Sequence, residues 1–212
     1  MPQYYEYELA KAAHKLVSEM LKLKPGEIIA VTADTESDPR VVDATAAAAF
    51  AVGAKPMVIW NPSSLGVGKA ADPMLPGEAL VGALSKVDAW VEYNNQWIFY
   101  SKAYDDMIKK NRVRCICLTG MNVASIVRTI GKVNVPLVIK LGDKLVELTQ
   151  AADKVHIKNA AGTDIVGYNR GRRVSQPGGI AEKPGPYMLC GQVGWNPVEE
   201  TINGVVAIDG WE

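Results

Sequence analysis

The sequence lacks the features that mark several classes of protein. Its 23 Lys and Arg residues balance 23 Asp and Glu residues, so the formal net charge is zero. A basic excess typical of nucleic-acid or anionic-membrane binding is missing, and we expect neither partner. No apolar run approaches the roughly 20 residues that a helix needs to cross a bilayer. Residues Met1 to Glu6 carry neither the basic nor the apolar part of a secretory signal, so we expect a cytoplasmic protein.

Cysteine and histidine are scarce. The three cysteines, Cys115, Cys117 and Cys190, are an odd number and too few for a disulfide framework. Cys115 and Cys117 alternate with apolar residues, and we interpret them as small residues of a buried strand rather than as metal ligands. His14 and His156 lie in different predicted elements and form no H-E-x-x-H or H-x-H motif. We therefore expect this chain alone to hold no metal.

Nucleotide-binding motifs are incomplete. The segment Gly66–Lys69 lacks the spacing of a phosphate-binding loop, and Ala70 stands where a hydroxyl would bind magnesium. After the first predicted strand, Thr32–Thr35 replaces the glycine-rich turn of a dinucleotide-binding fold. Both nucleotide-binding interpretations are thereby disfavoured.

What the sequence does contain is a regular alternation of strand and helix patterns. Apolar spacing and capping signals predict helices over residues 4–23, 41–52, 77–84, 97–110 and 136–152. Short apolar runs predict strands over residues 28–31, 57–60, 89–92 and 113–118. Continuously apolar strands that alternate with helices indicate a parallel sheet with helices on both faces. We predict an α/β domain over residues 1–152.

The pattern changes after Asp153. Short alternating runs broken by glycine and proline predict antiparallel β structure, so residues 153–212 are interpreted as the start of a β-rich, catalytic-type domain. About 60 residues are few for an independent core. The final segment, Ile208–Glu212, is typical of a strand that leaves a turn. We expect the second part to be incomplete and the chain to be truncated.

Polar residues gather where the predicted parallel strands end. Ligands of open α/β sheets bind at this edge, but Asp and Asn are also ordinary cap and turn residues there, and we favour the second interpretation. The residues are Asp34, Thr35, Asn61, Asn94, Asn95, Gly120 and Asn122. A basic cluster, Arg170, Arg172 and Arg173, could hold an anion, but a solvated turn is the favoured interpretation.

The order of motifs in the second part resembles the M29 metallo-aminopeptidases, the aminopeptidase T and S group. These proteins carry a G-T-D-L strand, a glycine-rich turn with a G-E-V element, a proline, an N-G pair and a strand that ends in D-G. The matching segments here are Ala161–Ile165, Gly171–Arg172, Lys183–Gly185, Met188–Val193, Pro197–Gly204 and Ile208–Gly210. Leu23–Glu27 and Gly53–Pro56 are similar to the opening βαβ unit of the same family.

This resemblance implies a metal-dependent enzyme that removes N-terminal amino acids and holds divalent metal such as zinc, cobalt or iron. The glutamate of the G-E-V element is a metal ligand in the family, and Gln192 occupies its position here. A neutral amide balances the charge of two divalent ions poorly. By family position Gln192 lies near substrate or metal, and the remaining ligands are expected downstream of Glu212. The catalytic residues of this chain stay unknown.

Two other functions remain open. The same fold is used by 2,5-dihydroxypyridine dioxygenase, a ring-opening enzyme with a single iron that lacks the G-E-V ligand, and Gln192 is compatible with that branch. Alternatively, the chain is a non-catalytic domain for dimerisation or regulation. We expect a peptide or small-molecule substrate for the intact protein, and a homo-oligomer.

Overall fold

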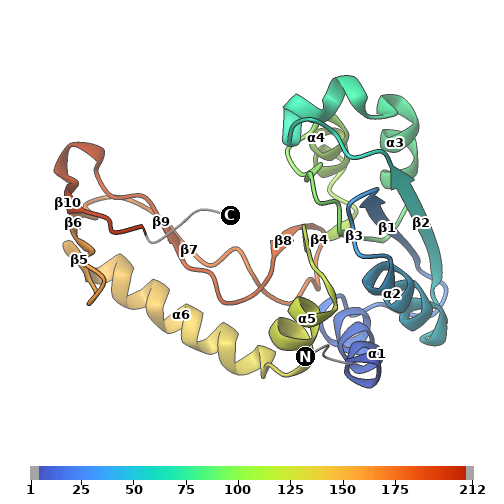
Figure 1. The fold of residues 1–212 in the computed structure, drawn as a ribbon, viewed down its shortest axis with the longest axis horizontal. Helices are drawn as coiled ribbons and strands as arrows, with labels where there is room; N and C mark the ends of the chain where they lie inside the picture. Colours follow the sequence, from blue (N-terminus) through green and yellow to red (C-terminus); the bar gives the residue numbers. More distant parts are fainter. Residues whose placement is uncertain (1–4, 209–212) are drawn as a thin grey trace. The chain divides into compact units, whose positions relative to one another are not determined.

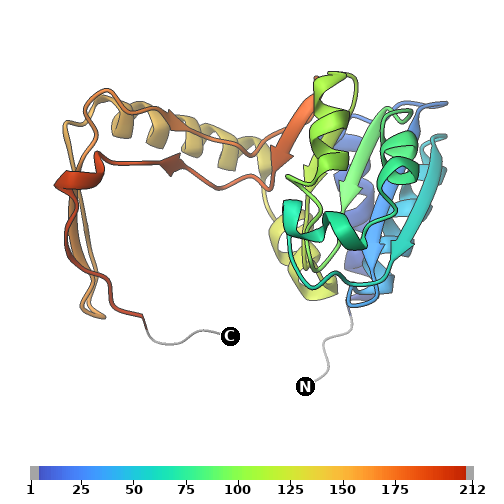
Figure 2. The same ribbon diagram turned by 90° about the horizontal axis from the view of Figure 1, so that it is seen from above.

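The computed structural model describes residues 5–208, which fold as two compact units (Figures 1 and 2). The first unit contains the residues up to Val135 together with Gly178–Leu189. The second contains Pro136–Pro177 and the residues from Cys190 onward. Among the described residues, no helix has the length and apolar character needed to cross a membrane.

A five-stranded parallel sheet forms the centre of the first unit. Its strands are β1 (Ile28–Asp34), β2 (Lys55–Asn61), β3 (Ala89–Glu92), β4 (Arg114–Cys117) and β8 (Gly185–Met188), in the order β2-β1-β3-β4-β8. The inner strands β1 and β3 are almost entirely buried, which is why they read as continuous apolar runs. The predicted parallel sheet is confirmed.

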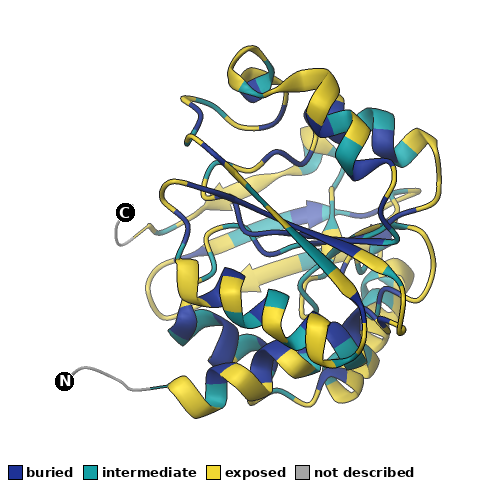
Figure 3. Cartoon of the chain, turned by 90° about the vertical axis from the view of Figure 1, so that its right-hand side faces the viewer, coloured by how far each residue is buried: buried dark blue, intermediate teal, exposed yellow. Residues whose placement is uncertain are grey.

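Helices cover both faces of this sheet, as predicted (Figure 1). On one face, α3 (Gly77–Leu84) packs with α4 (Lys102–Lys109), beside the 3-10 helix η2 (Gly68–Met74). The other face carries α1 (Glu6–Lys15), its π-helical continuation η1 (Leu16–Met20), α2 (Pro39–Ala51), α5 (Val123–Ile126) and the π-helical turn η3 (Val127–Gly131). Figure 3 shows that these helices have one buried and one exposed side.

Local capping explains where several helices begin. The Asp38 carboxylate accepts a hydrogen bond from the Arg40 N–H, and Pro39 occupies the first turn of α2. Ser101 caps α4 through the Tyr104 N–H, so this helix begins at Lys102 and not at Trp97 as predicted. Asn122 caps α5, a helical segment that we did not predict.

The second unit is built from one long helix and short antiparallel strands. Helix α6 (Val135–Ala151) leads into β5 (Lys154–Lys158) and β6 (Asp164–Tyr168), and β10 (Asn203–Val205) completes a sheet of order β10-β6-β5. A two-stranded ribbon joins β7 (Val174–Ser175) to β9 (Gly194–Trp195), and η4 (Glu199–Thr201) is a 3-10 turn. The predicted antiparallel character of this part is confirmed.

The units divide at a different place from the boundary predicted at residue 152. Helix α6 belongs to the second unit, and residues 178–189 return to the first. There β8 pairs in parallel with β4, from Arg114 opposite Gly185 to Cys117 opposite Met188. The Ala181 N–H also donates to the Met20 carbonyl. A long-range parallel pairing of this kind leaves no local pattern in the sequence.

Candidate functional site

A buried polar layer lies at the carboxyl ends of the parallel strands in the first unit. The sheet register places Thr32, Glu92 and Cys117 level with one another on β1, β3 and β4. One pleat further along, Asp34 lies level with Asn61. Thr32, Asp34, Asn61 and Glu92 are all buried. Open α/β sheets bind ligands at this edge, so the layer is a candidate site.

Glu92 is the central carboxyl group of this layer. Its Oε1 accepts hydrogen bonds from the N–H groups of Ile98 and Phe99, and the Cys117 thiol donates to Oε2 over 3.6 Å. Burial raises the pKa of Glu92 to about 8, although these three hydrogen bonds act in the opposite direction. Glu92 is therefore mostly protonated at neutral pH.

Asp34 organises the neighbouring turn. Its carboxylate accepts hydrogen bonds from the Glu36 N–H (3.0 Å), the Ser37 hydroxyl (3.1 Å) and the Gln96 N–H (2.9 Å). Asp34 and Glu92 thus hold the middle of the loop that connects β3 to α4, through Gln96 on one side and Ile98 and Phe99 on the other. Both carboxyl groups act here as structural acceptors for backbone N–H groups.

Most of the other strand-end residues also serve local structure. The Thr35 hydroxyl accepts from the Ser63 N–H, the Asn95 amide donates to Glu36, and Asn122 is a helix cap. Within residues 5–208, two buried atoms of the predicted set have no hydrogen-bond partner, Nδ2 of Asn61 and Oδ1 of Asn94. The cap-and-turn interpretation therefore accounts for most, but not all, of these residues.

Cys115 and Cys117 are thiols with little nucleophilic character. Burial raises the pKa of Cys115 far above its ordinary value and raises the pKa of Cys117 to about 11, in both cases with a further contribution from Glu92. Thiolates are the reactive form, so neither residue is suited to nucleophilic catalysis at neutral pH.

Gln192 is exposed in the segment between β8 and β9 and belongs to the second unit. The buried polar layer belongs to the first unit. Sequence reasoning missed Glu92, which we treated only as the last residue of a strand. The signal was a carboxyl group at the end of an otherwise apolar run.

The described residues do not fit a metal centre. From residue 5 to residue 208, no group of three or more His, Cys, Asp and Glu side chains lies close enough to hold an ion. His14 is exposed on α1, and His156 is paired with Asp164 at 2.7 Å on the surface of the β5–β6 hairpin. The single imidazole–carboxylate pair of His156 and Asp164 falls short of the three or four ligands of a metal site.

Two arginines of the basic cluster in the second unit form ion pairs. The Arg170 guanidinium contacts the Asp153 carboxylate at 2.7 Å, and Arg172 contacts Glu199. These pairs hold the turn after β6, which agrees with the solvated-turn interpretation.

The comparisons with known proteins agree with this fold. The family model of 2,5-dihydroxypyridine 5,6-dioxygenase (NicX) matches residues 10–210. No curated protein matches the chain. The structure of 2,5-dihydroxypyridine dioxygenase from Pseudomonas putida KT2440 is similar with a TM-score of 0.71 and 19% identity, over 96% of this chain and 59% of the dioxygenase.

The structure of wild-type AmpT from Thermus thermophilus is similar with a TM-score of 0.59 and 16% identity, over 95% of this chain and 64% of AmpT. The chain thus spans about six-tenths of the length of both proteins. The fold that M29 aminopeptidases share with the dioxygenase is confirmed. Because the family model covers nearly the whole sequence, the chain belongs to the 2,5-dihydroxypyridine 5,6-dioxygenase (NicX) family.

Proposed function

We propose that the protein takes part in the oxidative opening of a hydroxylated pyridine ring by dioxygen. The observation that carries the proposal is the family match over residues 10–210. The higher TM-score to the dioxygenase (0.71) than to AmpT (0.59) supports it as well. Peptide hydrolysis is the competing function.

Gln192 also favours ring opening over peptide hydrolysis. In the resembling aminopeptidases a glutamate at this position helps to hold two divalent metals. Two adjacent divalent ions need anionic ligands to offset their repulsion, and an amide supplies no charge. A single ferrous ion, which the dioxygenase branch implies, does not have this requirement.

The described residues contribute their fold to this proposed activity, and no group of three or more His, Cys, Asp and Glu side chains among them fits a metal ion. A divalent metal remains part of the proposal for the whole protein. A cytoplasmic location is also proposed. It is supported by the reduced thiols of Cys115 and Cys117, since reducing compartments keep cysteines out of disulfides.

The proposal is tested by ligand competition on the 212-residue chain. Saturation-transfer NMR under nitrogen compares 2,5-dihydroxypyridine with leucine amide, a mimic of a peptide N-terminus. We expect saturation transfer to the pyridine protons and none to the leucine methyl groups. In air, with ferrous iron added, any loss of the ring must be matched by one molecule of dioxygen consumed, measured with an oxygen electrode.

Binding of leucine amide without binding of the ring, or release of leucine from leucine p-nitroanilide, would reject the ring-opening function. Failure of both ligands to bind would also count against it. Gln192→Glu gives a further comparison with the parent chain. The aminopeptidase function predicts that this variant binds divalent metal more tightly, without a change in ring binding.

A further inference from the structure

Strand β10, at the edge of the sheet in the second unit, contains the one Asn–Gly pair of the sequence, Asn203–Gly204. Both residues are exposed. The strand has 3 residues and pairs with β6 on one side, in the order β10-β6-β5. A short strand with a single neighbour opens at a small cost in free energy, so water reaches this pair in the folded chain.

The fold itself requires glycine at position 204. The φ of Gly204 is +130°, a backbone conformation that residues with a side chain rarely adopt. A Cβ atom there would overlap the Asp164 carbonyl oxygen on the paired strand β6. Glycine is thus needed for the pairing of β10 with β6, and it leaves its own nitrogen open to attack on the preceding side chain.

The Asn203 side chain also has a freedom that other asparagines of this unit lack. Oδ1 of Asn159 accepts a hydrogen bond from the Thr163 N–H at 3.1 Å, and Asn169 donates to a carbonyl of α6 at 2.6 Å. Within residues 5–208, no hydrogen bond holds the Asn203 amide. Its Cγ atom can therefore approach the nitrogen of Gly204, the next residue in the chain.

We propose that Asn203–Gly204 is a site of spontaneous deamidation in the folded chain. The Gly204 nitrogen gives its proton to hydroxide and forms a bond to the Asn203 Cγ atom, which closes a five-membered succinimide ring. The Cγ–Nδ2 bond breaks, and the amide group takes a proton from water and leaves as ammonia. Water then opens one of the two ring carbonyls and leaves aspartate or isoaspartate at position 203. One water is taken up and one ammonia is lost, so the reaction needs no oxidant or reductant.

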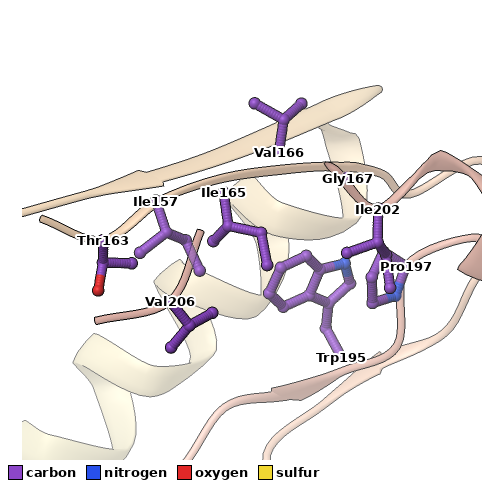
Figure 4. A pocket seen from close by; sticks show the side chains of 9 residues that line it. All are labelled: Ile157, Thr163, Ile165, Val166, Gly167, Trp195, Pro197, Ile202 and Val206. Carbon is purple, nitrogen blue, oxygen red and sulfur yellow. The ribbon is translucent and has the colours of Figure 1, made fainter. Parts of the chain in front are cut away.

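The product weakens the edge of this sheet. Isoaspartate continues the main chain through its side-chain carbon, which adds one methylene group to the backbone of β10. Asn203 lies opposite Val166 of β6, so the added carbon disturbs the register of the two strands. Figure 4 shows Ile202 and Val206, on either side of the pair, among the side chains that line an apolar depression, and we expect deamidation to loosen this lining. None of these steps depends on the proposed ring-opening activity.

The test follows the mass of the peptides that contain asparagine. The folded chain is incubated at mildly alkaline pH, cleaved after glutamate and analysed by liquid chromatography and mass spectrometry. We expect a gain of one dalton at Asn203, in two chromatographically separate products, and no gain at Asn111, an exposed asparagine that precedes Arg112. The rate should rise about tenfold per pH unit, because the deprotonated fraction of an amide rises by this factor below its pKa.

A second experiment tests the opening of β10. The Thr163 hydroxyl accepts a hydrogen bond from the Ala207 N–H at 3.1 Å and so fastens the chain just after this strand. Thr163→Ala should accelerate deamidation by about fivefold to tenfold, the effect of one lost hydrogen bond on strand opening. Thr129→Ala, which removes a hydroxyl hydrogen bond to a carbonyl in the first unit, should leave the rate unchanged.

A synthetic peptide of residues 201–208 gives the rate of the same pair without the fold. If this peptide deamidates while Asn203 of the folded chain stays intact over the same time, β10 protects the pair and the proposal is wrong. Equal conversion of Asn203 and Asn111 would also overturn it, because the following glycine would then have no effect. Equal rates for the parent chain and Thr163→Ala would reject strand opening as the limiting step.

Discussion

At the scale of single residues, burial changes the pKa of Glu92, an effect that its neighbours in the sequence do not indicate. The carboxyl group has no exposed surface, and it is surrounded by Thr32, Cys117 and the backbone of the β3–α4 loop. Two N–H donors lower its pKa, but desolvation has the larger effect and raises it to about 8. Glu92 is thus a buried neutral acid that organises a loop.

This shift makes stability depend on pH. Below pH 4.5 the Glu92 carboxyl is protonated in both the folded and the unfolded chain. Its titration then has no effect on the free energy of unfolding. As the pH rises from 4.5 to about 8, the unfolded chain loses this proton while the folded chain keeps it, so stability falls. Above about pH 8 the loss is complete, on the order of several kcal/mol.

Glu92→Gln should remove this dependence. The amide oxygen can still accept from Ile98 and Phe99, but it has no proton to lose. We expect the substituted chain to be more stable than the parent at pH 8 and similar to it at pH 4.5, in urea unfolding followed by fluorescence. The same substitution at exposed Glu78 is the control. If the free energy of unfolding depended on pH in the same way for the parent and for Glu92→Gln, the raised pKa of Glu92 would be refuted.

At the scale of elements, close helix packing in the first unit depends on small residues. Gly131 ends the π-helical turn η3 and lies against α1, where a Cβ atom would come within 3.0 Å of the Ala12 Cβ. Ala12 is completely buried. The two helices therefore meet through glycine and alanine, and there is no room for a larger side chain.

Gly131→Val should destabilise the chain by roughly 1–3 kcal/mol, because overpacking separates α1 from η3. Gly82, in the exposed middle of α3, is the matched control, since a Cβ atom there meets nothing within 4 Å. Gly82→Ala should raise stability by about 0.5–1 kcal/mol through lower backbone entropy in the unfolded chain. Thermal unfolding by circular dichroism measures both changes, and equal effects of the two variants would contradict this packing.

At the scale of the whole molecule, the second unit leaves a row of leucines uncovered. Leu137, Leu141, Leu145 and Leu148 follow one side of α6, and each is more than half exposed. On the adjacent sheet, Val205 of the edge strand β10 is exposed as well. Contiguous apolar surface on a helix and an unpaired strand edge both favour association.

We therefore expect the chain to form a homo-oligomer through α6. Multi-angle light scattering should give a mass above 22.9 kDa that rises with concentration. The double substitution Leu141→Lys and Leu145→Lys should shift the chain toward monomer, because it places charge in the leucine row. Phe50→Lys, at an even more exposed apolar residue of α2, should leave the mass of the oligomer unchanged. A monomer mass for the parent at all concentrations would exclude this interface.

The sequence alone determined the elements whose signals are local. Strand Ala89–Glu92 and helix Gly77–Leu84 lie where they were predicted, since apolar runs and helical spacing act within a few residues. The parallel sheet, its helical cover and the antiparallel second part follow from the same patterns. The family resemblance also rested on the order of short motifs along the chain.

Only the tertiary structure decided what depends on contacts between distant residues. The return of β8 to pair with β4 joins residues about 70 positions apart, and it places residues 178–189 in the first unit. The pKa of Glu92 is likewise set by burial. Desolvation and long-range pairing involve neighbours in space that no local pattern specifies, and so the chemistry of Glu92 became visible only in the folded chain.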